Sequence, residues 1–245
     1  MAVAAGLIGC FALMRRMALA GDALSHVALP GVGVALALHV NPLLGAAAML
    51  FFAALLVWAL DQPSRLATEA LIGVTFSAAL AIGSMTTSGD DLIEALFGGA
   101  TVRPSLAEAA FGLVGAAAVT LFVLRRKRAL VIAIVSSDIA RTVGVDVRRL
   151  NFLYLQMFAL TIALGLRYLG VLLMGALIII PAATARRLSH SLNQMLITAA
   201  GVAVAVTLIG SAVGVFWHRP TGPLVVTAAA ACFFLTFLRR VDPTT

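Results

Sequence analysis

The chain is a succession of apolar runs, each about as long as a path across a lipid bilayer. A helix needs roughly 17 to 25 apolar residues to cross the hydrocarbon core. The chain has 62% hydrophobic and 11% charged residues, whereas about a quarter of the residues of a soluble globular domain are charged. The sequence therefore predicts an all-α, polytopic bundle of transmembrane helices, with spans at about residues 23–39, 42–60, 69–88, 105–124, 151–169, 170–187, 192–216 and 222–238.

The first apolar stretch, residues 1–14, is short for a membrane span. Fourteen helical residues extend about 21 Å, against a hydrocarbon core of roughly 30 Å. We expect this helix to be partial or to begin upstream. Counting it, the sequence predicts about eight or nine transmembrane helices in a single transmembrane domain, residues 1–245.

The basic residues are distributed unevenly between the two ends of the predicted spans. If the loops after spans one, three, five, seven and nine are cytoplasmic, they hold 14 of the 17 Lys and Arg residues. Because positive loops stay in the cytoplasm, this pattern favours an odd number of spans and a cytoplasmic C-terminus. Topology and the anionic inner leaflet account for the net charge of +7, so no nucleic-acid partner is expected.

A polar motif, Gly21–His26, places a carboxylate and an imidazole in this apolar sequence. Ionisable groups within a membrane are costly and are therefore functional candidates. Asp22 and His26 are four residues apart, which on a helix puts them on one face within reach of a common ligand. Pro30 follows after four more residues and has no N–H, so it frees the His26 carbonyl. An alternative stays open, in which Asp22 caps a helix that begins at Ala23.

The donor set of this motif suits a transported metal ion better than a resident one. One Asp oxygen and one His nitrogen are too few for a closed tetrahedral zinc site, but two copies around a two-fold axis supply two of each. A transport site must also release its ion, so a sparse site without thiolates is expected. Imidazole suits zinc and carboxylate suits manganese. His39 is a candidate for assisting entry, although its turn neighbours Asn41 and Pro42 favour an interfacial residue.

A second proline, Pro181, lies inside the predicted span 170–187 and frees the Leu177 carbonyl. We expect it to kink or break that helix. Broken helices often line the path of transporters, but proline kinks also occur without that role.

The longest polar stretch between spans extends from Arg125 to Asn151. Within it, residues 136–146 have the pattern of a short helix, with a Ser or Asp cap and Gly144 as its stop. A capped, positively charged helix parallel to the membrane suits docking to a cytoplasmic partner. A surface helix that lies on lipid is an equal alternative on this pattern alone.

Four motifs follow one another along the chain. The first consists of Arg15-Arg16-Met17 together with Gly21–His26 and Pro30-Gly31. The other three are the Ser137–Val145 loop, Pro181–Arg186 and Pro220–Pro223. In this order and spacing they resemble the zinc/manganese permease family of bacterial ABC importers, from about residue 7 to the C-terminus. The resemblance implies a multi-pass permease of the bacterial inner membrane that works as a homodimer. It further implies a cytoplasmic ABC ATPase dimer that binds the ATP and an extracytoplasmic metal-binding protein. The transported ion is then Zn²⁺ or, next, Mn²⁺, with no permanently bound cofactor.

The resemblance also assigns roles to residues. Asp22 and His26 correspond to the metal path at the centre of the permease. A coupling segment at about 136–150 docks to the ATPase through Ser137, Asp138, Ala140, Arg141, Gly144 and Val145. The outer gate corresponds to the region that contains Asp91, Glu94, Phe97 and Gly98.

Two other function classes remain to be weighed. An intramembrane hydrolase would use Ser211 as a nucleophile, but the strand-to-helix elbow that such a serine needs is missing from the pattern. An ion-coupled secondary transporter would use Asp22 and His26 as a proton relay. The chain has no Gly-x-x-x-x-Gly-Lys-Ser/Thr loop, so ATP hydrolysis must come from a separate polypeptide and the chain itself is not expected to be an enzyme.

Overall fold

A computed structural model describes residues 1–17, 19–61, 66–86, 106–169, 171–219 and 221–238 of the chain. These ranges contain helices and no strand, which confirms the predicted all-α fold. The helices are α1 (Ala2–Met14), α2 (Ala20–Ala37), α3 (Pro42–Asp61), α4 (Thr68–Thr86), α6 (Leu106–Val135), α7 (Ser137–Thr142), α8 (Val147–Leu169), α9 (Val171–Leu188), α10 (Leu192–Trp217) and α11 (Thr221–Leu238).

Six of the described helices, α2, α3, α6, α8, α10 and α11, are long and apolar enough to cross a membrane. Two shorter apolar helices, Ala2–Met14 and Thr68–Gly83, accompany them. The predicted polytopic helical bundle is thus confirmed, and each predicted span has a helix at its position.

The predicted boundaries around the polar stretch 125–151 are wrong. Helix α6 is 30 residues long and does not end near residue 124 but continues to Val135, and α8 already begins at Val147. The basic run Arg125–Arg128 consists of residues with good helix propensity. Charge therefore interrupts the apolar sequence of α6, which resumes at residues 129–135, and does not end the helix. The connection between the two long helices is reduced to the short α7 and its flanking turns.

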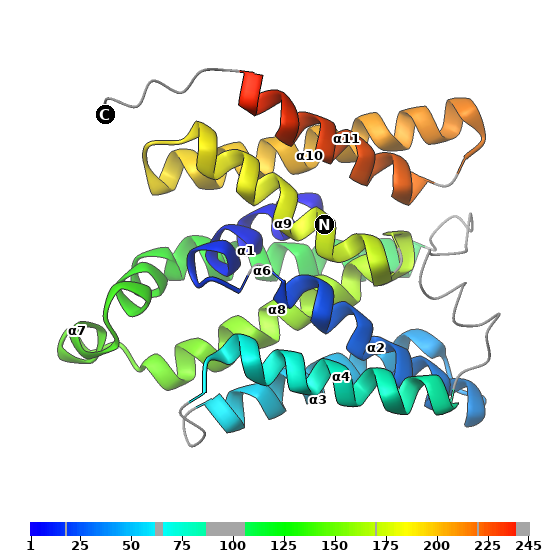
Figure 1. Ribbon diagram of the computed structural model, residues 1–245, viewed down its shortest axis with the longest axis horizontal. Helices are drawn as coiled ribbons and strands as arrows, with labels where there is room; N and C mark the ends of the chain where they lie inside the picture. The colour runs from blue at the N-terminus through cyan, green and yellow to red at the C-terminus, as the bar shows by residue number, and fades with distance from the viewer. Residues whose placement is uncertain (18, 62–65, 87–105, 170, 220, 239–245) are drawn as a thin grey trace.

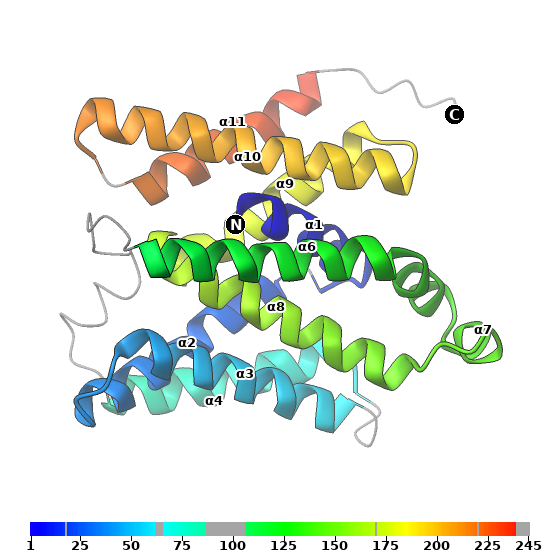
Figure 2. The same ribbon diagram turned by 180° about the vertical axis from the view of Figure 1, so that it is seen from behind.

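The long helices run back and forth across the molecule (Figures 1 and 2). Helices α2, α3 and α4 pack together on one side, α10 and α11 pack together on the other, and α1, α6, α8 and α9 lie between them. Helix α1 is the most enclosed, because every residue from Ala4 to Ala12 is buried. Helix α7 and the turn from α9 to α10 lie at the left edge of Figure 1, whereas the turn from α2 to α3 lies at the right edge.

Glycines allow several of these helices to approach closely. A Cβ atom on Gly31 of α2 would collide with the Gly45 carbonyl of α3, and the reverse collision occurs at Gly45. A Cβ on Gly9 of α1 would likewise collide with the Ile178 carbonyl of α9. In a bilayer, where apolar surface alone does not drive helices together, such backbone contact is a main source of association. The position of α2 is therefore fixed by backbone packing.

Candidate metal site and coupling helix

Helix α2 carries the Asp22 and His26 pair, and it begins earlier than a capping role for Asp22 requires. Its N-cap is Leu19, which makes no side-chain capping bond. The Ala23 N–H already donates to the Leu19 carbonyl at 3.0 Å. The alternative in which Asp22 caps a helix starting at Ala23 is therefore wrong. Asp22 instead lies in the first turn, where the helix dipole favours a carboxylate.

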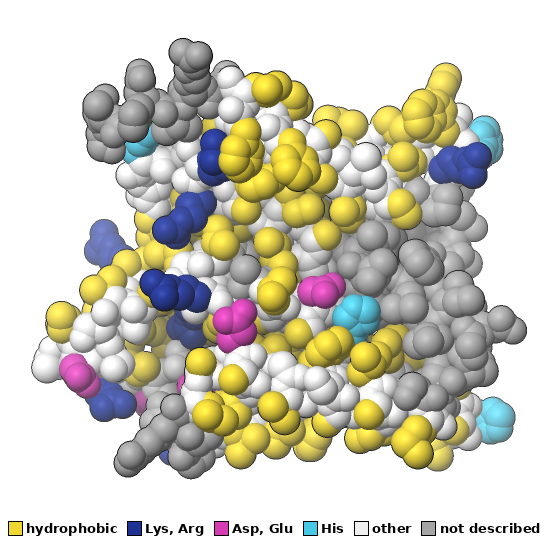
Figure 3. Space-filling model, viewed as in Figure 1, with side chains coloured by type: hydrophobic (Ala, Val, Ile, Leu, Met, Phe, Trp, Pro, Cys, Tyr) yellow, Lys and Arg dark blue, Asp and Glu magenta, His cyan; other side chains and the backbone are white. Residues whose placement is uncertain are grey.

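The two side chains of the pair lie on one face of α2, as their spacing predicts. The distance from His26 Nε2 to Asp22 Oδ1 is 3.8 Å, and the side chains are 14% and 51% exposed, respectively. This distance is too long for a hydrogen bond. Figure 3 shows a histidine next to an acidic side chain near the middle of the molecular surface in view. The geometry leaves lone pairs on both groups for a third atom.

Neighbouring helices hold this pair in place. The His26 ring packs against Phe76 of α4, with ring centroids 5.6 Å apart. A Cβ on Gly175 of α9 would be 2.8 Å from both the N and the Cα of Asp22, so the two backbones touch at the site. The buried Ser25 hydroxyl donates to the Gly21 carbonyl at 2.6 Å. Gly175 is a part of the site that sequence reasoning missed, since a glycine in an apolar span gives no sign of its partner.

The other expected participants do not join the pair in the described structure. His39 is exposed beyond the end of α2 with φ 55°, about 20 Å along the helix direction from His26. Within the described ranges, no cluster of three or more His, Cys, Asp or Glu residues is placed to hold a metal ion. The four residues assigned to the outer gate, Asp91, Glu94, Phe97 and Gly98, lie outside the described residues.

Neither of the two prolines breaks its helix. Pro30 lies inside the continuous α2 and Pro181 inside the continuous α9. Pro30 is buried, and its ring faces Gly83 of α4, where an added Cβ would be 3.2 Å from Pro30 Cδ. Pro181 is buried as well, so both helices stay continuous inside the bundle despite the missing N–H. The expectation of a break at Pro181 is therefore wrong. The carbonyls of His26 and Leu177 still lack the helical N–H donor that a proline four residues later cannot supply.

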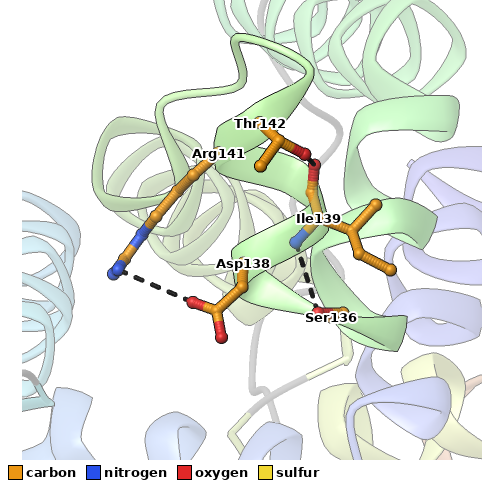
Figure 4. Close-up of polar contacts among 5 residues, drawn as sticks. All are labelled: Ser136, Asp138, Ile139, Arg141 and Thr142. Atoms are coloured by element: carbon orange, nitrogen blue, oxygen red, sulfur yellow. Dashed lines mark hydrogen bonds and ion pairs between the residues drawn. The ribbon is translucent and has the colours of Figure 1, made fainter.

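Helix α7 has the cap (Figure 4) and the stop that the sequence predicts. Ser136 is its N-cap, and the Ser136 Oγ accepts from the Ile139 N–H at 3.3 Å. At the other end Gly144 adopts φ 79°, and the Val145 N–H donates to the Ala140 carbonyl at 2.9 Å. Ala140 is fully buried, whereas Asp138 and Arg141 form an exposed ion pair at 3.9 Å. The helix thus packs by Ala140 and presents charge to its surroundings.

A second contact ties the end of this connection to α3. The Trp58 indole N–H donates to the Arg148 carbonyl at 3.0 Å, and the Arg148 guanidinium lies 4.9 Å from the centre of the Trp58 ring. Helix α3 packs in turn along α2. A continuous series of contacts therefore leads from α7 through the start of α8 and α3 to the helix that carries Asp22. Sequence reasoning missed Trp58, because a tryptophan in an apolar span is expected to be an ordinary buried packing residue.

The model of the ABC 3 transport family matches residues 1–240 of this chain. The chain belongs to the ABC 3 transport family. Among similar proteins, the manganese transport system membrane protein MntC of Listeria monocytogenes is 31% identical over 240 residues, which cover 96% of this chain and 85% of that protein. The high-affinity zinc uptake system membrane protein ZnuB of Haemophilus influenzae is 30% identical, over 95% of this chain and 91% of that protein.

The fold of this ABC 3 chain is also similar to a solved structure titled PsaBC from Streptococcus pneumoniae in complex with Fab. The TM-score is 0.81 at 27% sequence identity, over 99% of this chain and 88% of the matched chain. This ABC 3 chain is therefore a multi-pass transport permease and not an enzyme, and ATP hydrolysis belongs to a separate subunit. The resemblance found in the sequence motifs is confirmed.

Proposed function

We propose that this permease is the membrane subunit of an ATP-driven importer of divalent metal ions in the bacterial inner membrane. The proposed cargo is zinc, with manganese next. The observation that carries the proposal is the Asp22 and His26 pair on one face of α2, separated by 3.8 Å, with the carboxylate half-exposed. Ionisable residues inside an apolar span are costly and are therefore functional candidates by default.

The names of the similar proteins support a metal cargo without choosing one metal. They refer to manganese transport and to zinc uptake, and a chelated iron transport system membrane protein YfeD of Yersinia pestis is 30% identical over 240 residues. One imidazole and one carboxylate per chain are compatible with zinc and with manganese. Selection between the metals is then assigned mainly to the extracytoplasmic metal-binding protein that delivers the ion.

A homodimer completes the proposed site. One copy offers two donor groups, whereas zinc in proteins takes four ligands. In the proposed dimer, Asp22 and His26 of both copies face a two-fold axis and form a transient four-ligand site. The 51% exposure of the Asp22 side chain supports this arrangement, since the carboxylate is still open to a ligand from outside the chain.

The proposed orientation places α7 on the cytoplasmic side, against the ATPase dimer. Basic side chains gather at the left of Figure 3, the edge at which Figure 1 shows α7. Positive residues mark the cytoplasmic side of membrane proteins, and the end of α11 lies toward the same edge, so the C-terminus is proposed to be cytoplasmic as well. Movement of α7 would then reach Asp22 through the Trp58 contact and α3.

The experiment that tests the function is uptake of radiolabelled zinc and manganese into proteoliposomes that contain the permease, its ATPase and its binding protein. We expect uptake of one metal to require ATP and to persist when the proton gradient is collapsed. The Asp22→Ala variant should lose uptake. The matched control is Glu69→Ala, which removes an exposed carboxylate from the first turn of α4 and should transport normally.

Three results would contradict the proposal. Uptake that follows the proton gradient after ATP is depleted would identify a secondary transporter. Wild-type protein that moves neither metal with its subunits assembled would refute the cargo. Normal uptake by a well-inserted Asp22→Ala variant would show that the pair is no part of the path.

A further inference from the structure

A cavity of about 380 Å³ lies beside α7, apart from the Asp22 and His26 pair. Residues from the turn after α1, the start of α4, the end of α6, α7 and the start of α8 form its walls. Its polar lining consists of three guanidinium groups, two hydroxyls and one amide, from Arg15, Arg16, Arg141, Thr68, Ser137 and Asn151. Among the described residues that line it, none is acidic. The cavity therefore has the electrostatic character of an anion site.

Arg15 is the most constrained of these arginines. Its guanidinium carbon lies 4.4 Å from the centre of the Tyr154 ring. Its Nε–H is buried without a hydrogen-bond partner, which is uncommon, because buried donors in folded proteins are nearly always paired. The nearby Asp61 carboxylate already accepts from the Thr68 hydroxyl at 2.6 Å. The folded chain thus holds a half-buried cation in place and leaves its buried Nε–H donor unused.

Burial lowers the pKa of Arg15, whereas the charge of Asp61 opposes that change. Removing this guanidinium from water therefore has a free-energy cost, and an anionic ligand would offset that cost. The other two arginines are free to contribute. Arg16 is exposed in a turn with φ 61°, and the ion pair of Arg141 joins two largely exposed side chains at 3.9 Å, a contact of little energetic weight.

We propose that this cavity, which we call the arginine pocket, binds a phosphate group that is carried by an anionic lipid headgroup or by a free phosphate compound. A planar guanidinium group can donate two parallel N–H hydrogen bonds to two oxygens of one phosphate. Apolar side chains, among them Met17 and Ile134, line the same cavity. In a lipid site they would contact the apolar part of the lipid next to its phosphate. Basic pockets between helices on the cytoplasmic side commonly take lipid headgroups, so the lipid source rests on the orientation given under the proposed function.

An occupied arginine pocket would join parts of the permease that are separate in sequence. Arg15 and Arg16 follow α1, whereas Arg141 belongs to α7. A phosphate held between them bridges the core helix α1 and the coupling helix. Occupancy would therefore fix the position of α7 relative to the bundle and make coupling sensitive to the anion.

The test is native mass spectrometry of the full-length permease, both alone and in complex with its ATPase subunit, exchanged into detergent with defined lipid. We expect anionic phosphatidylglycerol to be retained and zwitterionic phosphatidylcholine to be washed away. The Arg15→Gln/Arg16→Gln variant should lose retention by about 25-fold, at roughly fivefold for each basic residue. The matched control, Arg125→Gln/Arg126→Gln, removes two exposed arginines of α6 outside the pocket and should retain the lipid. Because Arg15 packs on Tyr154, the single variant Arg16→Gln, with a roughly fivefold loss, serves if the double variant does not fold.

A parallel thermal-shift series separates the two sources of the phosphate. Stabilisation by phosphatidylglycerol alone supports a lipid site, and equal stabilisation by inorganic phosphate supports a free-phosphate site. Equal retention of phosphatidylglycerol by wild type, both pocket variants and the control, without any phosphate effect, overturns the proposal. It is also overturned if the pocket variants lose only the ATPase subunit, since the pocket then receives protein. None of these measurements depends on transport, so they test the arginine pocket independently of the proposed metal cargo.

Discussion

The contact between Gly175 of α9 and the backbone of Asp22 makes a single methyl group a sharp probe of the site. In Gly175→Ala the new Cβ starts 2.8 Å from the Asp22 N and Cα atoms, closer than real Cβ contacts occur. Backbone atoms cannot rotate away, so α2 and α9 must separate by about half an ångström, with a stability cost of about 1–3 kcal/mol, as for overpacking in cores. The displaced backbone is that of the proposed metal ligand.

The assay pairs thermal unfolding in detergent with metal uptake in proteoliposomes. We expect Gly175→Ala to lower the Tm by several degrees and to reduce uptake strongly. The matched control is Gly201→Ala in α10, because a Cβ at Gly201 meets no atom within 4 Å and alanine is the better helix former by about 1 kcal/mol. The control should be as stable as wild type or more so. If the two variants behave alike, the inferred contact between α2 and α9 at Asp22 is refuted.

Three further predictions concern the connection between α6 and α8. Ser136→Ala should destabilise α7 by about 1 kcal/mol through loss of its N-cap, seen as faster amide exchange in α7; unchanged exchange would refute the cap. Gly144→Ala should cost about 1 kcal/mol, because φ 79° disfavours a side chain although the space is open, whereas helical Gly73→Ala, also in open space, should not destabilise; equal unfolding temperatures would contradict this. Trp58→Phe should cost about 1 kcal/mol by leaving the Arg148 carbonyl without its indole donor and should lower metal-stimulated ATPase activity; unaltered coupling would exclude this route.

The architecture could be predicted because the membrane imposes a simple rule. Any backbone that crosses lipid must satisfy its own hydrogen bonds, so long apolar runs have to be helices. The rule fails where a helix leaves the bilayer. Charged residues with good helix propensity let a helix continue, and so α6 runs through Arg125–Arg128 to Val135 where the sequence suggested a loop. Pro181 does not interrupt α9, because a membrane helix accommodates a proline when its surroundings satisfy the freed backbone groups.

The site was predictable only where its geometry is local. The spacing of Asp22 and His26 and the cap at Ser136 follow from helix periodicity and capping chemistry, and the structure confirms both arrangements. The support of the site depends on contacts between distant segments. Gly175 touches Asp22 from more than 150 positions away, and no rule of sequence spacing brings them together. The role of the pair in binding metal stays a prediction.

Anomalous X-ray scattering from crystals of the assembled permease, grown with zinc or manganese, tests the proposed metal site most directly. The prediction is one metal peak on a two-fold axis, bounded by Asp22 and His26 of both copies and weakened or absent in the Asp22→Ala variant. A dimer in which these side chains face lipid, or a metal peak elsewhere that Asp22→Ala leaves unchanged, would contradict it.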